Sequence, residues 1–450
     1  MYTPLYTALL ELYSKNQLSF HMPGHSGEKG MEDFRLLSEI DTTEVPESDN
    51  LFFAGGPIAE AERAAASFFG AQKTRLLVGG SSSGVLAMVG AAVREGEKII
   101  CDRFCHRSFV SALVFSGAVP VWVTPESLEG GALWGGIAPA DVERALRENP
   151  EAKAVYITSP NYFGCASDVS AIAEVAHKYG AALLVDGAHG AHFGLSPLLP
   201  PAPWKCGADL CTVSAHKTLP ALTQAAWLHI NSDLPRLETM LKMHQSSSPS
   251  YILMASLDYA RAKMEEDGER LWTCLAENAL AVFPEQGSIP GKYVKYKDPT
   301  RLVLPTGGNP FEAAERLRKE HGISVECSYG RGVVCITNIS HTAADLERLK
   351  TAMRAVAENS PSPVPEFTSE IHSAVMTPRR AFYADVEEVE LSKAVGRVCA
   401  REVLLYPPGV PRILPGEVVT EADIAAISGL AAAGGEVHGV ENGYICCVKL

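Results

Sequence analysis

Short apolar runs alternate with stretches of helical period through the first half of the chain. The apolar runs are typical of buried strands and cover residues 76–78, 98–101, 119–123, 154–158, 182–185 and 210–214. The helical stretches cover residues 58–69, 85–93, 110–116, 141–146 and 169–179. Such alternation implies strands joined by crossover helices. The pattern therefore predicts an α/β fold with a mostly parallel sheet covered on both faces.

A different pattern begins past Met254, where a long helical stretch leads into a smaller unit. Residues 286–358 hold β-prone runs at 301–304 and 333–336 and helical stretches at 311–320 and 343–358, which is typical of a small α+β domain. Ser360-Pro-Ser-Pro-Val-Pro-Glu366 is a stiff, proline-rich linker. The predicted organisation is an arm at 1–45 with a short helix at 5–13, a large domain at 46–285, the small domain at 286–358, the linker at 359–366 and a C-terminal α+β domain at 367–450.

Composition narrows the class of protein. Lys and Arg total 39 against 53 Asp and Glu, a net charge of −14 without a basic run, which argues against nucleic acid or a membrane surface as a partner. The 11 cysteines lack the paired spacing of a metal site, so we expect no metal and the reduced thiols of a cytoplasmic protein. No apolar run approaches the ~18 residues of a membrane span. The first 13 residues lack the basic start of a signal peptide.

Polar and reactive side chains follow the predicted strands. They are Ser81, Ser82, His106, residues 158–162, Asp186, Ser214 and Lys217. Ligands of open parallel sheets bind at the carboxyl ends of the strands. We therefore expect these side chains to meet in one site.

Lys217 is the single amine of a stretch that runs from Gly207 to Pro220. Apolar chain surrounds it, and partial desolvation there would lower its pKa and make a neutral amine available to condense with a carbonyl. Taken alone, a surface lysine with its amine in water is the commoner explanation. Lys217 needs partners before a Schiff base is the better interpretation.

The partners form a recognisable set. Ser81 and Ser82 follow a strand and a glycine turn and precede a helix, which is the pattern of an anion cradle, although simple N-capping by serine also produces it. Asp186 ends a buried strand, where it could equally be a turn residue, and His106 and His189 could be core or turn histidines. A carbonyl-binding lysine, a phosphate cradle, a carboxylate for a pyridine nitrogen and a histidine for an aromatic ring together describe a pyridoxal 5′-phosphate site.

Short motifs are spread over nearly the whole chain. They are Thr3-Pro-Leu-Tyr, His21-Met-Pro-Gly-His25, Asp41-Thr-Thr-Glu-Val-Pro, Gly80-Ser-Ser, Asp102-Arg-Phe-Cys-His-Arg-Ser108, Pro160-Asn-Tyr-Phe-Gly164, Asp186-Gly-Ala-His-Gly190, Ser214-Ala-His-Lys217, Ser248-Pro-Ser-Tyr251, Ala255-Ser-Leu-Asp258 and the block from Tyr406 to Glu417. In this order they resemble the Orn/Lys/Arg decarboxylases, in the short bacterial form without the N-terminal wing domain. The resemblance implies a large domain of fold type I that binds pyridoxal phosphate, followed by a small α+β domain and a C-terminal α+β domain.

The same resemblance implies an activity and a role for each site residue. The expected reaction is decarboxylation of arginine, lysine or ornithine to the amine and CO2, with arginine slightly preferred, as part of polyamine biosynthesis. Lys217 would be the Schiff-base lysine, Asp186 the partner of the pyridine nitrogen, His106 the residue stacked on the ring and His189 its neighbour. The phosphate would be held by Ser81, Ser82, Ser214 and His216. Ser248 would reach the phosphate of a neighbouring subunit, in a homodimer or larger homo-oligomer with a shared active site.

Several positions depart from the family pattern. Ser26 stands where a lysine is common, Gly187 where a glutamate is common, and Arg412 where an apolar residue is usual. Asn50 and Phe52 stand where an acid and a histidine are usual near the expected substrate entrance. These departures leave the cofactor residues intact and bear on the substrate.

Two other functions share these cofactor residues. An aminotransferase or Cα–Cβ lyase would need an arginine to hold the substrate carboxylate, and Arg331 is the candidate in the small domain. A homologue that binds the cofactor but has lost turnover at its altered entrance is the non-enzymatic alternative.

Overall fold

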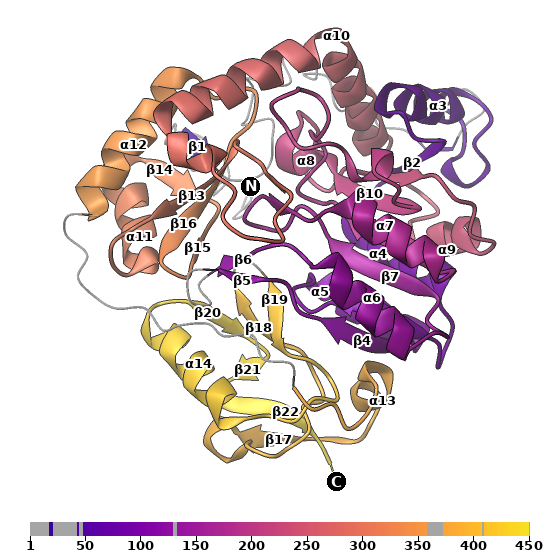
Figure 1. Ribbon diagram of the computed structural model, residues 1–450, viewed down its shortest axis with the longest axis vertical. Helices are drawn as coiled ribbons and strands as arrows, with labels where there is room; N and C mark the ends of the chain where they lie inside the picture. The colour runs from indigo at the N-terminus through magenta and orange to yellow at the C-terminus, as the bar shows by residue number, and fades with distance from the viewer. Residues whose placement is uncertain are drawn as a thin grey trace, which may run out of the picture.

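A seven-stranded sheet forms the centre of the large domain in the computed structural model (Figure 1). The structure describes residues 18–20, 43–44, 48–128, 133–357, 372–406 and 409–449. In spatial order the strands are β2 (Lys73–Leu77), β11 (Ala226–Ile230), β10 (Leu210–Ser214), β9 (Ala182–Asp186), β7 (Ala154–Thr158), β3 (Lys98–Asp102) and β4 (Val119–Val123). β11 pairs antiparallel with β10 and β2, and the other neighbours pair in parallel. The carboxyl ends of β10, β9, β7 and β3 therefore meet at one edge of the sheet.

Helices cover both faces of this sheet, which confirms the predicted fold class. One face carries α3 (Pro57–Phe69), α6 (Pro139–Glu148), α7 (Val169–Lys178) and part of α10 (Tyr251–Val282), and the other carries α4 (Gly80–Ala92), α5 (Arg107–Ser116) and α9 (Leu237–His244). Strand β9 is apolar up to Asp186 because helices cover both of its faces. Leu183 and Val185 pack against the first set of helices, whereas Leu184 packs against the second.

Helix α4 begins at Gly80, five residues before the predicted start at 85. Glycine and serine are poor helix formers, so the hydrophobic pattern alone placed the start too late. Packing explains the helix instead, because Gly84 lies directly on β10: a Cβ atom there would come within 2.3 Å of Thr212 Oγ1. The early start places Ser81 and Ser82 in the first helical turn.

The small domain contains a three-stranded antiparallel sheet, β13 (Arg301–Pro305), β16 (Gly332–Ile336) and β15 (Cys327–Tyr329), with α11 (Pro310–His321) and α12 (Ala343–Ala357). Both predicted β-prone runs are strands; β14 (Ile323–Val325) and β15 were missed because each has three residues. β14 pairs in parallel with β1 (Leu18–Phe20), which comes from the predicted N-terminal arm. The predicted helix at 5–13 and the linker at 359–366 lie outside the described residues.

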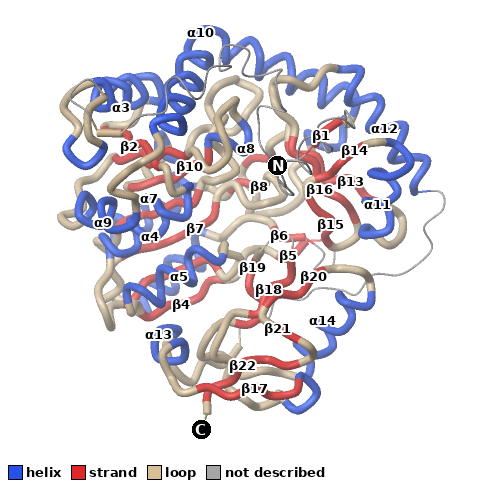
Figure 2. Tube along the Cα trace, turned by 180° about the vertical axis from the view of Figure 1, so that it is seen from behind, coloured by secondary structure: helices blue, strands red, loops and turns tan. Residues whose placement is uncertain are grey.

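The C-terminal domain lies against both other domains (Figures 1 and 2). It contains two antiparallel three-stranded sheets with the helices α13 (Pro378–Phe382) and α14 (Glu421–Ala432). The first sheet is β17 (Val386–Glu390), β22 (Tyr444–Val448) and β21 (Val440–Glu441), and the second is β19 (Val410–Ile413), β18 (Val403–Tyr406) and β20 (Glu436–His438). The buried Arg103, just after β3, joins this domain to the large one. Its guanidinium donates to the carbonyl oxygens of Pro411 and Arg412, each at 2.9 Å, and pairs with Glu417 at 3.3 Å.

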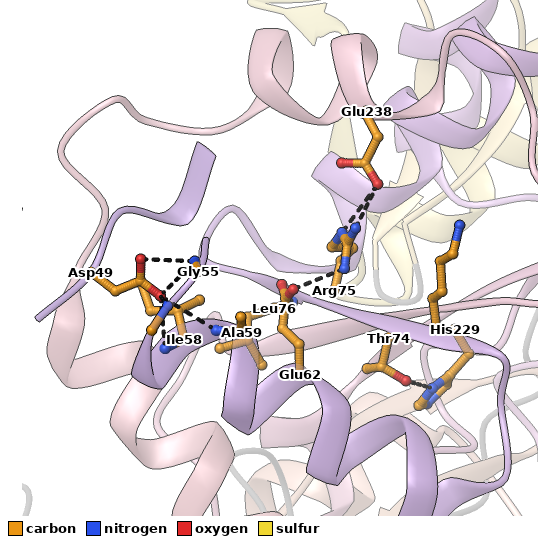
Figure 3. A network of polar contacts seen from close by, with 12 residues as sticks. Asp49, Gly55, Ile58, Ala59, Glu62, Thr74, Arg75, Leu76, His229 and Glu238 are labelled. Carbon is orange, nitrogen blue, oxygen red and sulfur yellow. Dashed lines mark hydrogen bonds and ion pairs between the residues drawn. The ribbon is translucent and has the colours of Figure 1, made fainter. Parts of the chain in front are cut away.

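Two buried or half-buried carboxylates join α3 to its surroundings near the edge strand β2 (Figure 3). Asp49 accepts hydrogen bonds from the backbone N–H groups of Gly56 at 2.7 Å and Ile58 at 3.2 Å, where α3 begins. Glu62 accepts from Leu76 N at 3.1 Å and pairs with Arg75 at 2.9 Å. Burial outweighs the attraction of Arg75 and raises the pKa of Glu62 to about 7.

Across the described ranges, no helix is long and apolar enough to cross a membrane. The same part of the chain holds no cluster of three or more His, Cys, Asp or Glu side chains that could bind a metal ion.

Candidate active site

Lys217 lies in α8 (Ala215–Thr218), a single helical turn that follows β10 at the carboxyl edge of the sheet. Its Nζ is 2.9 Å from His189 Nε2. Burial of the amine lowers the pKa of Lys217 to about 8, although the charges of Asp186 and Glu326 oppose this shift. The structure thus provides the partly desolvated amine that the sequence predicted.

Asp186 is the last residue of β9 and is 3% exposed. One carboxylate oxygen accepts from the Tyr156 hydroxyl at 3.1 Å and the other from Ala188 N at 3.0 Å. Burial raises the pKa of this carboxyl group, and the nearby Lys217 charge works in the opposite direction. The side chain is therefore held in one orientation at the floor of the site.

His106 is the N-cap residue of α5, just after β3. Its Nδ1 accepts a hydrogen bond from Ser108 N at 3.2 Å and lies 2.9 Å from Ser108 Oγ. Burial and the charge of Lys217 lower the pKa of His106 to about 3, so the ring is neutral at physiological pH. A neutral imidazole fixed at a helix start can present its flat face to an aromatic ring.

The N-terminus of α4 is the predicted anion cradle. Its N-cap residue, Gly79, has no side chain with which to cap the helix. The Ser214 hydroxyl donates to Ser81 Oγ at 2.8 Å, so these two predicted residues meet across β10 and α4. Ser82 is half-buried in the same turn. Backbone N–H groups at such a helix start favour a phosphate.

Two further predicted phosphate ligands make local contacts of their own. His216 Nδ1 donates to the carbonyl oxygen of Ala225 at 3.1 Å, within its own loop. Ser248 is exposed in the turn between α9 and α10, where its backbone N–H donates to Ser246 Oγ at 3.2 Å. The role of Ser248 toward a neighbouring subunit stays a prediction.

Two residues that sequence reasoning did not select, Arg301 and Glu326, lie in the site together with Tyr162 from the predicted stretch 158–162. Arg301 Nη1 is 3.0 Å from His189 Nδ1, and the Tyr162 ring packs edge-on against His189 with 4.8 Å between ring centroids. The Tyr162 hydroxyl donates to Glu326 at 2.5 Å. Tyr162 belongs to a quoted motif, but Arg301 and Glu326 are far from Lys217 in sequence and belong to the small domain, so no spacing could have indicated them.

The predicted carboxylate-binding candidate lies elsewhere. Arg331 is exposed in the turn between β15 and β16. Arg301 is the small-domain arginine that reaches the site, because the register of β13 directs it toward His189.

The positions that depart from the family pattern have local structural explanations. A Cβ atom on Gly187 would lie 3.0 Å from Cys211 Sγ, so the residue packs tightly on β10. Arg412 is buried and pairs with Asp423 at 2.6 Å. Asn50 accepts from Phe52 N at 2.8 Å and caps the short 3-10 helix Leu51–Phe53, which lies beside α3. Ser26 lies outside the described residues.

Comparisons with known proteins identify the family. The family model for the Orn/Lys/Arg decarboxylase major domain matches residues 3–285, and the model for the C-terminal domain of that family matches residues 363–439. An arginine decarboxylase of Bacillus subtilis is 34% identical over all of this chain and 97% of its own length. A lysine decarboxylase of Pseudomonas aeruginosa is 24% identical over 93% of this chain and 74% of its own length.

A solved structure agrees at the level of the fold. The constitutive lysine decarboxylase of E. coli matches with a TM-score of 0.77 at 21% sequence identity, over 99% of this chain and 82% of the other. The motifs, the paired domain matches and the full-length relative lead to one conclusion: the chain belongs to the Orn/Lys/Arg decarboxylase family.

Proposed function

We propose that the protein is a pyridoxal 5′-phosphate-dependent decarboxylase of a basic amino acid, with arginine preferred over lysine and ornithine. The observation that carries this proposal is the Lys217 amine, which is partly desolvated, 2.9 Å from His189, and under the charge of Asp186. The preference for arginine is supported by the relatives. Those named arginine decarboxylase reach 34% identity, whereas those named lysine decarboxylase reach 24–25%.

The chain's own residues fit this cofactor. Lys217 would tether it, and the buried Asp186 carboxylate would stabilise a proton on the pyridine nitrogen. His106 would lie flat against the ring, and Ser81, Ser82, Ser214 and His216 would bind the phosphate. When bound, the cofactor supplies an electron sink for the pair released at the substrate Cα. The protein's part is to hold the bond to the carboxylate in the reactive orientation.

Glu326 supports a cationic substrate. Its carboxylate stands on the small-domain side of the site, and its charge there partly offsets the lowering of the Lys217 pKa by burial. The Tyr162 hydroxyl holds the carboxylate in place. Glu326 would attract the guanidinium of a bound arginine substrate.

The aminotransferase and lyase alternatives find less support among the described residues. Arg301 is engaged by His189, and Arg331 is exposed. A decarboxylase needs no arginine for the substrate carboxylate, because that group must leave.

We further propose that the enzyme works as a homodimer, in which Ser248 of one subunit reaches the phosphate bound by the other.

The test is to incubate the purified protein with carboxyl-labelled arginine, lysine and ornithine and to trap the released CO2. We expect CO2 to be released fastest from arginine. A Lys217→Ala variant should release no CO2 from any of the three substrates. Borohydride reduction followed by peptide mapping should place the cofactor on Lys217. A protein that releases no CO2 from any of the three would refute the activity, and a cofactor on another lysine would refute the site.

A further inference from the structure

The contacts of His189 determine where its proton is. Arg301 approaches Nδ1 at 3.0 Å, and Lys217 approaches Nε2 at 2.9 Å. A guanidinium has N–H donors and no acceptor, so Nδ1 must be the unprotonated, accepting nitrogen. The ring is then neutral, and its one proton is on Nε2.

The proton on Nε2 in turn determines the state of the lysine. Nε2–H is a donor, so the Lys217 nitrogen that it faces must offer a lone pair. An ammonium group has three donors and no lone pair. The contact at 2.9 Å is therefore favourable only when Lys217 is a neutral amine.

We infer that Arg301 is a positioning residue which, by fixing the tautomer of His189, favours the neutral amine form of Lys217. The other tautomer of His189 would carry its proton on Nδ1, where it would face an N–H of Arg301. The repulsion between these two donors excludes that tautomer. Burial acts in the same direction, because it lowers the pKa of His189 and lowers the pKa of Lys217 to about 8. Only the neutral amine can attack an aldehyde. The chain of contacts from Arg301 through His189 therefore prepares Lys217 to react with its cofactor.

The orientation of Arg301 depends on a glycine whose purpose the motifs alone did not reveal. Gly164 ends the motif that starts at Pro160 and has a φ of +77°. A Cβ atom there would lie 2.6 Å from Arg301 Cβ. Lys297 Nζ also donates to the Arg301 carbonyl oxygen at 2.8 Å. Arg301 is 1% exposed and has no room to turn away from His189.

The first test reads the tautomer directly. Nitrogen-15 NMR of histidine-labelled protein distinguishes a protonated ring nitrogen from an unprotonated one, and a His189→Gln variant identifies the signals of His189. We expect an unprotonated Nδ1 and a protonated Nε2 in the cofactor-free protein. A proton on Nδ1, or a doubly protonated ring, would overturn the inference whether or not the enzyme is active.

The second test measures the amine. The rate at which the full-length, cofactor-free protein takes up pyridoxal 5′-phosphate, trapped on Lys217 with borohydride, is followed from about pH 6 to about pH 10. In Arg301→Met we expect the midpoint to rise by roughly one pH unit, which is about tenfold less neutral amine at neutral pH. Arg301→Lys, which keeps a cation and a donor, should fall between the two. An unchanged midpoint in Arg301→Met would overturn the inference.

A double-variant cycle separates the hydrogen bond from simple charge repulsion. The side-chain amide that His189→Gln introduces can donate to Lys217 without help from Arg301, so Arg301→Met should shift the midpoint much less in that background. Equal shifts in both backgrounds would mean that Arg301 acts through its charge alone, and the inference would be wrong. The inference rests on the proposed tether at Lys217 but not on the substrate, so an inactive protein with the expected tautomer would count against the proposed function only.

Discussion

Individual side chains in this protein act through the groups that surround them. Lys217 and Glu326 would both be ordinary surface charges elsewhere. Here burial and hydrogen bonding determine the chemical role that each side chain can have. Burial lowers the pKa of the Lys217 amine, whereas the Glu326 carboxylate acts on that pKa in the opposite direction. Two predictions belong to this scale.

The first concerns recognition of the substrate. Replacing Glu326 by Gln removes the proposed partner of the substrate guanidinium and leaves the shape of the side chain. We expect the KM for arginine to rise about 10- to 100-fold, the usual loss for a hydrogen bond to a charged group, with a smaller change in kcat. Steady-state kinetics measures both. Tyr162→Phe is the matched control, since it keeps the Glu326 charge and should change KM less; a larger effect in the control would contradict the assignment.

The second concerns the pH dependence of stability at Glu62 (Figure 3). The folded protein holds its proton up to about pH 7, whereas the unfolded chain releases it near the ordinary value of 4.5. The stabilisation is therefore complete below pH 4.5 and is lost as the pH rises through 7. Relative to Glu62→Gln, the wild-type protein should lose about 3 kcal/mol of unfolding free energy across that window.

Urea unfolding at a series of pH values measures this difference. The exposed Glu60, on the same helix, gives the control variant Glu60→Gln, whose curve should run parallel to that of the wild-type protein. A constant difference between wild-type protein and Glu62→Gln at every pH would show that the folded protein does not retain that proton.

At the scale of elements, the site residues are positioned by close contacts between the backbone of one segment and the side chains of another. Helix α4 reaches β10 through Gly84, and the loop after β7 reaches β13 through Gly164. Both contacts join segments that are far apart in sequence. They explain why particular glycines matter in an otherwise apolar core.

Gly164→Ala tests the second approach, and Gly180→Ala is its control. Both residues have a positive φ, 77° and 72°, but a Cβ atom on Gly180 would meet nothing within 4 Å. Each variant should lose roughly 1–2 kcal/mol from the left-handed backbone. Gly164→Ala should lose about 1–3 kcal/mol more from the clash with Arg301 and should slow cofactor uptake as Arg301→Met does. Equal losses of stability with unchanged uptake would show that Gly164 does not position Arg301.

At the scale of the whole molecule, the C-terminal domain is part of the support for the active site. Arg103 holds that domain through Pro411, Arg412 and Glu417. It also lies three residues before His106, which is predicted to cover the cofactor ring. One short loop therefore carries both the contact with the C-terminal domain and the predicted contact with the cofactor ring.

Arg103→Met should break this connection. Two carbonyl groups and the buried Glu417 would lose their contacts with Arg103, and breaking a buried ion pair costs about 3–5 kcal/mol. We expect faster hydrogen exchange in residues 372–449 and weaker cofactor binding. Arg107→Met is the control, because the Arg107 side chain that pairs with Glu402 is 56% exposed. Its loss should cost less than about 1 kcal/mol. Unchanged exchange in the C-terminal domain of Arg103→Met would show that Arg103 does not hold it.

The sequence by itself determined the layers and the candidate cofactor residues of this protein. Strands buried on both faces must be apolar throughout, so β9, β7 and β10 were visible as runs, and the residues just after them had to meet at one edge. That reasoning selected Asp186, His106, Ser81, Ser214 and Lys217. It placed the start of α4 too late, because a glycine- and serine-rich turn becomes helical here through packing on β10 rather than through its own preference.

Tertiary structure alone decided the second half of the site. Arg301 and Glu326 come from the small domain, and neither periodicity nor spacing relates them to Lys217. Their partners depend on how two domains approach each other, which is a property of contacts between distant segments. For the same reason the sequence could name Lys217 as the reactive amine, whereas only the arrangement of Arg301 and His189 around it indicates how the neutral form of that amine is favoured.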